Sequence, residues 1–162
     1  MHAKVQVAEV QEVVARIIGK PCCRKRVWRG RSLHLGFGER IPHGDPQLID
    51  EFYGEWEIGT YHCAWRVIAQ GKVLCGRQDV VDSIDELNQA LNEISIGRFA
   101  SLVQLTPLDV RVEFDNGLAV DFLSTVSDGD ACFHIFFGAE NLCVQFTADR
   151  GWEIGDFDKP WD

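Results

Sequence analysis

The sequence has no apolar run near the ~20 residues that a membrane-spanning helix needs. It also lacks the apolar core of a secretion signal, because Lys4, Gln6 and Glu9 interrupt the valines near the N-terminus. These two absences favour a cytoplasmic protein that has no membrane anchor.

Motifs for cofactor binding and covalent catalysis are absent too. There is no Gly-x-Ser-x-Gly turn for a serine nucleophile, no Walker sequence and no Cys-x-x-Cys pair for zinc. Gly36-Phe37-Gly38 lacks the third glycine and the following helix of a dinucleotide-binding loop. Cys132 and His134 form the best pair of metal ligands, but a buried strand explains them more simply. The sequence therefore predicts no catalytic residue, no metal and no cofactor.

The cysteine pattern is not that of a disulfide-stabilised domain. Such frameworks are typical of shorter, secreted chains, and adjacent cysteines do not easily bridge each other. His62 and Cys63 are neighbours in a strand-like segment, so their side chains should point to opposite faces. We expect six reduced thiols, several of them buried: Cys22, Cys23, Cys63, Cys75, Cys132 and Cys143.

Length and composition indicate one ordered domain over residues 1–162. Domains most often have about 100–150 residues, and the 46% hydrophobic and 25% charged residues are ordinary globular values. We expect the N-terminal helix and basic segment, residues 1–31, to pack on a β-rich body formed by residues 32–162.

Two helices are predicted. Apolar residues recur at helical spacing over residues 5–18, and Gly19 and Pro21 supply a stop signal. The second helix has an N-cap candidate in Ser83, with Glu86 three positions later as in a capping box. Its apolar stripe consists of Ile84, Leu87, Leu91 and Ile94.

Most of the remaining chain alternates between apolar and polar residues, as strands do. Leu33, Leu35 and Phe37 share one face of a predicted strand, with His34 and Gly36 on the other. Asn116-Gly117 is a strong hairpin signal. We expect the flanking Val112, Phe114, Val120 and Phe122 to be buried on one sheet face. The predicted fold is α+β: one domain with a mostly antiparallel sheet of six or more strands and two helices.

Charge is distributed unevenly along the chain. Residues 1–31 hold eight Lys/Arg and two acids, whereas residues 32–162 hold eight Lys/Arg and 23 acids. A nucleic-acid accessory protein could use this basic segment, with Trp28 stacking on a base. The net charge of −9 argues against it. We expect the segment to pair with the acidic body or with a second copy in a homodimer. Its basic patch consists of Arg24, Lys25, Arg26, Trp28, Arg29 and Arg31.

Acids and aromatics alternate near the C-terminus. Such a surface could engage a basic protein, with the acids steering the encounter and the aromatics anchoring it. The alternative is a solvated tail held down by its tryptophans. The candidate partner-binding residues are Asp149, Trp152, Glu153, Asp156, Asp158 and Trp161.

Four short stretches carry a resemblance to a known group of proteins. They are Gly-Glu-Trp-Glu-Ile-Gly from Gly54, Cys-Ala-Trp-Arg-Val from Cys63, Cys-Gly-Arg-Gln-Asp from Cys75, and Asp-Val-Arg-Val-Glu-Phe-Asp-Asn-Gly from Asp109. Together, over residues 54–121, they resemble small bacterial domains of unknown function, some of which are encoded near polymorphic toxins and are suspected immunity proteins.

The resemblance implies binding and carries over no catalytic position. The sequence thus favours a bacterial cytoplasmic binding protein of the immunity type that acts through its acidic surface on a protein partner. An enzyme or small-ligand-binding protein, with a site assembled from scattered strand residues, is the alternative.

Overall fold

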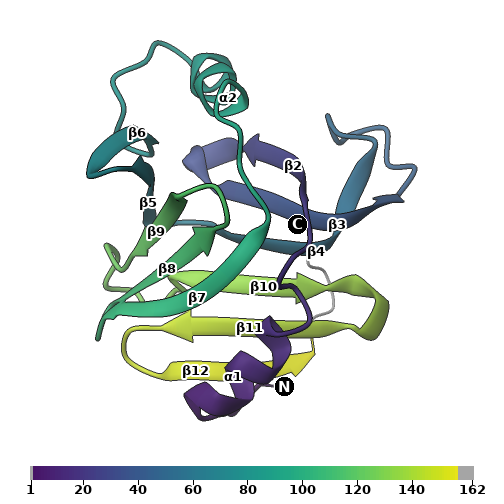
Figure 1. Ribbon diagram of the computed structural model, residues 1–162, viewed down its shortest axis with the longest axis vertical. Coiled ribbons are helices and arrows are strands. Elements are labelled where there is room, and N and C mark those ends of the chain that lie inside the picture. Colours follow the sequence, from purple (N-terminus) through teal and green to yellow (C-terminus); the bar gives the residue numbers. More distant parts are fainter. Residues whose placement is uncertain (1, 157–162) are drawn as a thin grey trace.

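The computed structural model describes residues 2–156, in which twelve strands form two antiparallel sheets (Figure 1). The larger sheet has the order β1-β12-β11-β10-β4-β3-β2 and the smaller one β6-β5-β9-β8-β7. The larger sheet contains β1 (His2–Lys4), β2 (Cys22–Val27), β3 (Leu33–Pro42), β4 (Phe52–Thr60), β10 (Phe133–Phe137), β11 (Leu142–Thr147) and β12 (Gly151–Asp156). The smaller sheet contains β5 (Ala64–Ala69), β6 (Lys72–Gly76), β7 (Phe99–Thr106), β8 (Asp109–Phe114) and β9 (Leu118–Leu123).

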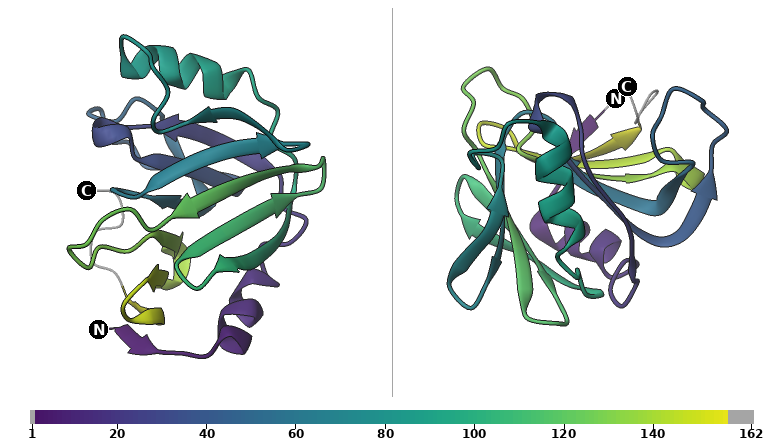
Figure 2. Two further views of the ribbon diagram at one scale, coloured as in Figure 1. Left: turned by 90° about the vertical axis from the view of Figure 1, so that its left-hand side faces the viewer. Right: turned by 90° about the horizontal axis from the view of Figure 1, so that it is seen from above.

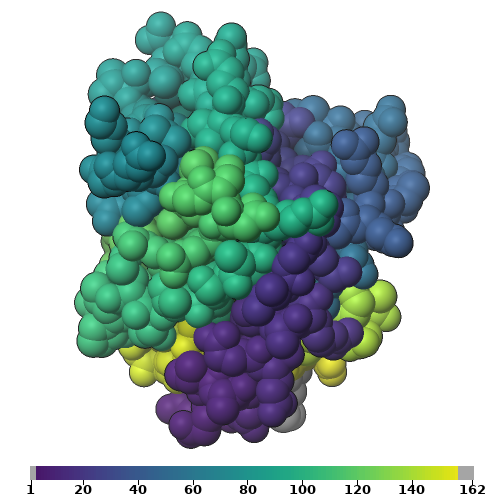
Figure 3. Space-filling model, viewed as in Figure 1, coloured from purple at the N-terminus to yellow at the C-terminus, as the bar shows by residue number. Residues whose placement is uncertain are grey.

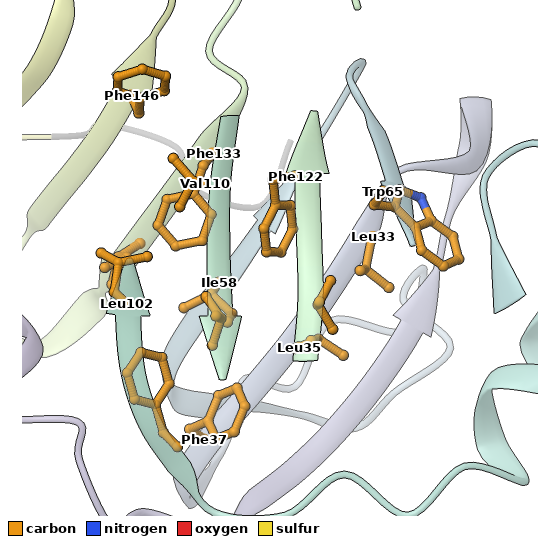
Figure 4. Packing of buried hydrophobic residues seen from close by; sticks show 14 of the residues in the cluster. Leu33, Leu35, Phe37, Ile58, Trp65, Leu102, Val110, Phe122, Phe133 and Phe146 are labelled. Atoms are coloured by element: carbon orange, nitrogen blue, oxygen red, sulfur yellow. The ribbon is translucent and has the colours of Figure 1, made fainter. Parts of the chain in front are cut away.

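The apolar faces of the two sheets pack against each other and form one core (Figure 4). Phe37 of the larger sheet stacks on Phe114 of the smaller sheet at a centroid distance of 5.8 Å. Phe122 and Phe133 meet edge to face at 4.9 Å. Because Leu33 and Leu35 are also fully buried, the alternating residues of β3 must present His34 and Gly36 on the outer face of the larger sheet.

The predicted hairpin is confirmed. Val112 pairs with Val120 across β8 and β9, and Phe114 and Phe122 are 4% and 0% exposed. Gly117 has φ +83°, a conformation that favours glycine. The prediction of an α+β fold with mostly antiparallel sheet is likewise confirmed.

The two helices lie at opposite ends of the molecule (Figure 2). α1 (Val7–Val14) is shorter than predicted, because residues 15–19 form turns instead of helix. α2 (Ile84–Asn92) begins at Ser83, whose hydroxyl accepts a hydrogen bond from the Glu86 amide at 3.3 Å. Within residues 2–156, neither helix has the length and apolarity that crossing a bilayer requires.

The first 31 residues contribute more than a packed helix, because β1 and β2 are the two edge strands of the larger sheet. The alternation pattern did not predict β2, since its sequence Cys-Cys-Arg-Lys-Arg-Val is mostly charged. Asn88 of α2 covers its end: the amide oxygen accepts from Val27 N at 2.8 Å, and the amide nitrogen donates to Val27 O at 2.7 Å.

Candidate functional site

The outer face of the larger sheet carries polar side chains in two neighbouring rows, each of which also contains a glycine. In one row, His34 of β3 and His134 of β10 lie on either side of Gly59 in β4. In the next row, Glu57 of β4 lies beside Gly36 of β3. The chain thus brings residues from distant parts of the sequence to one patch of the sheet.

Glycines make room for this arrangement. A Cβ on Gly36 would overlap the Glu57 carboxylate, and one on Gly54 would lie 2.8 Å from it. Gly59 places no side chain between the two imidazoles, whose ring centroids are 6.1 Å apart. The glycines of β3 and β4 therefore permit large polar side chains to lie flat against the sheet.

Glu57 and Asp50 hold the two arginines of β2. Arg24 Nη1 lies 2.6 Å from Glu57 Oε1, and the Gly54 amide donates to Glu57 Oε2 at 2.9 Å. Arg26 binds Asp50 through two hydrogen bonds of 3.0 and 2.6 Å. Arg24 Nε is 3.2 Å from Asp50 Oδ2, an ion-pair contact that lacks hydrogen-bond geometry.

Burial shifts the protonation of these groups in opposite directions. Burial raises the pKa of Glu57 to about 7, against the opposing charge of Arg24 and the Gly54 hydrogen bond. Burial would also raise the pKa of Asp50, but the hydrogen bond from Arg26 and both arginine charges outweigh it and lower that pKa. Burial, helped by the Arg24 charge, lowers the pKa of His34 to about 4.

His134 is fully buried, and burial holds its pKa well below the usual value. Both histidines are therefore neutral at physiological pH. His34 Nε2 lies 3.0 Å from Ser32 Oγ, whereas His134 Nε2 has no hydrogen-bond partner among residues 2–156. The Tyr61 ring packs on His134 at a centroid distance of 4.8 Å.

A pocket of about 50 Å³ opens beside this patch. One water needs roughly 10–15 Å³ by this measure, so the pocket admits a small group such as a carboxylate. The connection between β3 and β4, which forms the blue lobe at the right of Figure 3, supplies one wall. The lining residues are Arg24, Arg26, Trp28, His34, Leu48, Ile49, Asp50, Tyr53 and Tyr61. We call this the arginine pocket.

Contacts within the same chain engage the basic residues of the predicted patch. Arg24 and Arg26 are ion-paired in the arginine pocket. Lys25 donates to the backbone oxygens of residues 92 and 94 at the end of α2, and Arg31 to those of residues 77 and 79. The Arg29 guanidinium lies 6.0 Å from the Trp28 ring. Since these contacts are intramolecular, they give no reason for a second copy.

The predicted acidic surface is divided between the core and the exterior. Trp152 is 7% exposed and packs in the core, with Nε1 donating to Gln104 Oε1 at 3.1 Å, so its ring is not available to a partner. Glu153 is partly buried beside Gln145 and Arg150. Asp149 and Asp156 are exposed. Asp158 and Trp161 lie outside the described residues.

Sequence reasoning did not single out Glu57, Asp50, Tyr53 or Tyr61. The alternation of β3 placed His34 opposite the core, and this was the available signal for a polar outer face. His134 was considered only with Cys132 as a metal pair. Among the described residues, no three His, Cys, Asp or Glu side chains form a group suited to a metal ion.

Comparisons with known proteins were made for both the sequence and the structure. No family model, curated protein or solved structure matches the chain.

Proposed function

We propose that this chain is a binding protein that holds a small carboxylate-bearing molecule in the arginine pocket. The observation that supports the proposal is Arg24 Nε, a buried donor that lies 3.2 Å from Asp50 Oδ2 without hydrogen-bond geometry. Buried polar groups are nearly always hydrogen-bonded, so this poorly satisfied donor, on a residue that lines the pocket, favours a better-placed acceptor. A carboxylate oxygen is a strong acceptor for a guanidinium.

The rest of the pocket suits the body of such a ligand. Trp28, Tyr53 and Tyr61 offer aromatic surface, and Leu48 and Ile49 add apolar contacts. Pockets of this kind combine apolar walls with a few polar groups that fix orientation. A short carboxylate such as acetate, which a pocket of about 50 Å³ can hold, is therefore the chemical class that we propose.

Charge balance adds a second expectation. The two arginines face Asp50 and Glu57, and burial raises the pKa of Glu57 to about 7. A bound anion beside Arg24 would raise the Glu57 pKa further, so binding should be accompanied by proton uptake at neutral pH. Affinity should then increase as the pH falls from 8 to 6.

The test is a titration of the full chain with acetate and with its neutral amide, acetamide, followed by calorimetry in two buffers of different ionisation enthalpy. We expect saturable binding of acetate, weaker binding of acetamide and proton uptake. Arg24→Lys keeps a charge opposite Glu57 but removes Nε, and should weaken acetate binding about tenfold, the equivalent of ~1.4 kcal/mol. Arg29→Lys, outside the pocket, is the matched control. Equal binding of acid and amide, or equal loss in both variants, would contradict the proposal.

A second candidate is recognition of a basic protein, as an immunity protein would recognise a toxin. The exposed Asp149 and Asp156 and the net charge of −9 favour it. The test is a pull-down of the protein encoded by the neighbouring gene at low and high salt. The double variant Asp149→Asn/Asp156→Asn should bind it more weakly, and the difference should shrink at high salt. A variant that binds as tightly as the parent would exclude this surface.

A further inference from the structure

Two histidines lie on either side of a glycine on the outer face of the larger sheet. His34 of β3 and His134 of β10 both pair with Gly59 of β4, the strand between them (Figure 1). Residues that are directly opposite in neighbouring strands share one face of a sheet, and Gly59 has no side chain to fill the space between the imidazoles. Their ring centroids are 6.1 Å apart. The two rings therefore converge over one glycine.

The His134 ring presents its edge, not its face, across the strands. Phe136 stacks on this ring at a centroid distance of 4.4 Å and an interplanar angle of 24°. Since Phe136 lies two residues further along the same strand and on the same sheet face, it covers a face of the imidazole in the strand direction. The plane of the His134 ring therefore extends across the sheet, toward the strand that carries His34.

The Nε2 atom of His134 gives an independent indication that another group binds here. It is buried and has no hydrogen-bond partner among residues 2–156. The residue is 3% exposed, so bulk water does not solvate this nitrogen. Buried polar atoms are nearly always satisfied, and an exception calls for a bound water, ion or ligand.

The width of the gap selects among these groups. A ring nitrogen lies about 1.1 Å from the ring centroid, so nitrogens that face each other across the gap are roughly 3.9 Å apart. A direct hydrogen bond between them needs about 3 Å, and a water that bridges them at a tetrahedral angle needs about 4.5 Å. Two metal–nitrogen bonds of ~2.0 Å in line span about 4 Å. The gap thus fits a metal ion held between two imidazoles.

The chemical state of the two rings suits ligation. Burial keeps both imidazoles neutral, which is the form that binds metal. The Ser32 hydroxyl lies 3.0 Å from His34 Nε2 and can accept a hydrogen bond from its N–H, which leaves the lone pair on Nδ1. Hydrogen bonds of this kind fix the tautomer and the orientation of histidines that ligate metals.

We propose that His34 and His134 bind one monovalent metal ion, copper(I), between their ring nitrogens. Among the described residues, no three His, Cys, Asp or Glu side chains form a group suited to a metal, so an ion that needs four protein ligands would lack them. Copper(I) is satisfied by two ligands, and imidazole is a good ligand for copper. Both ligands are neutral and the charge of Arg24 acts on His34, which favours one positive charge over two. The proposal requires no ligand in the arginine pocket.

The first experiment measures copper(I) binding by the full chain, without oxygen, in competition with the coloured chelator bicinchoninate. Thiols also bind copper(I), so accessible cysteines are first blocked with iodoacetamide, and X-ray absorption identifies the ligands. We expect one copper ion per chain, with two nitrogen neighbours at about 2 Å and no sulfur. Zinc(II) should bind more weakly than copper(I). Sulfur ligands, or tighter binding of zinc(II), would overturn the assignment.

Two variants separate this site from the other histidines. His134→Gln removes one of two ligands and should weaken copper(I) binding at least about a hundredfold, because loss of a mere supporting partner already costs about 10–100-fold. His62→Gln is the matched control, since His62 is on the exterior, ion-paired with Asp130, and this variant should bind copper(I) like the parent. Equal affinities of the two variants would contradict the proposal.

A second measurement needs no variant and so does not depend on whether His134→Gln folds. The chain is produced with isotopically labelled histidine, its accessible thiols are blocked, and one equivalent of silver(I), a redox-stable substitute for copper(I), is added. We expect the side-chain nitrogen resonances of His34 and His134 to shift together in the NMR spectrum. Those of His62 and of His43, whose two ring nitrogens already have hydrogen bonds, should stay in place. Shifts confined to His43 or His62, or no shifts at all, would overturn the assignment.

Discussion

Arg24 and Glu57 form a buried ion pair, 2.6 Å between Nη1 and Oε1, across a glycine of the strand that separates them. Gly36 lies between their positions in the sheet, and any side chain there would fill the space that the carboxylate occupies. Glu57 is 1% exposed. Removing a charged carboxylate from water is unfavourable, so burial raises the pKa of Glu57. The opposing charge of Arg24 does not fully offset this effect.

The first prediction concerns the pH dependence that Glu57 imposes on stability. Its pKa is about 7 when folded and 4.5 without the protein environment, so between these values the folded state holds a proton that the unfolded state releases. The contribution of Glu57 to the free energy of unfolding is therefore greatest below pH 4.5. It falls by about 3 kcal/mol as the pH rises to 7. Glu57→Gln should gain this amount relative to the parent across the window.

Urea unfolding at several pH values measures this difference. Glu51→Gln, which changes an exposed carboxylate on the neighbouring loop, is the control and should follow the parent within about 0.5 kcal/mol. A constant offset between Glu57→Gln and the parent would mean that Glu57 titrates normally in the folded protein.

His34 should produce a dependence of the opposite sign. Its folded pKa of about 4 lies below the unfolded value of 6.5, so between these values only the unfolded state is protonated. Stability should fall as the pH decreases from 6.5 to 4, by up to about 3 kcal/mol. His34→Gln should therefore be less sensitive to acid than the parent in urea unfolding. Identical acid profiles for His34→Gln and the parent would contradict the prediction.

The strands that sequence alone predicted are those whose two faces differ in polarity. Val112 and Phe114 alternate with charged residues because one face of β8 is buried and the other is not, and the Asn116-Gly117 turn fixes their register. β2 was not predicted, because its two faces do not differ in polarity. Its arginines are held by Glu57 and Asp50, and neither partner is near in sequence. α1 ends at Val14, where the chain continues as turns in which Arg16 N and Ile17 N donate to the backbone oxygens three residues earlier.

Most of the candidate site could not be predicted from the sequence. His34 and His134 become neighbours only through the order β3-β4-β10. Local patterns predict which face a side chain occupies, whereas the order of the strands decides which side chains share that face.

The buried residues of the β8–β9 hairpin allow a prediction of how much unfolding free energy one substitution removes. Phe114 is 4% exposed and stacks on Phe37, so Phe114→Ala should cost about 3–5 kcal/mol of unfolding free energy. Leu108→Ala, in the turn between β7 and β8, removes a side chain that is 51% exposed and should cost much less. Chemical denaturation of both variants gives the comparison, and equal losses would show that Phe114 is not part of the core.

The last prediction concerns the contact between α2 and the edge of the larger sheet. Asn88 is 7% exposed and its amide satisfies both backbone groups of Val27. Asn88→Ala would leave a buried N–H and a buried C=O unpaired, at about 1–3 kcal/mol for each. Asn92→Ala, at the exposed last residue of the same helix, gives the control, because it makes the same change of side chain without removing a buried hydrogen bond. Asn88→Ala should be destabilised by roughly 2–4 kcal/mol relative to Asn92→Ala.

Hydrogen exchange of the Val27 amide should also accelerate in Asn88→Ala alone, since that amide then has no acceptor. Unchanged exchange would show that another group protects the end of β2.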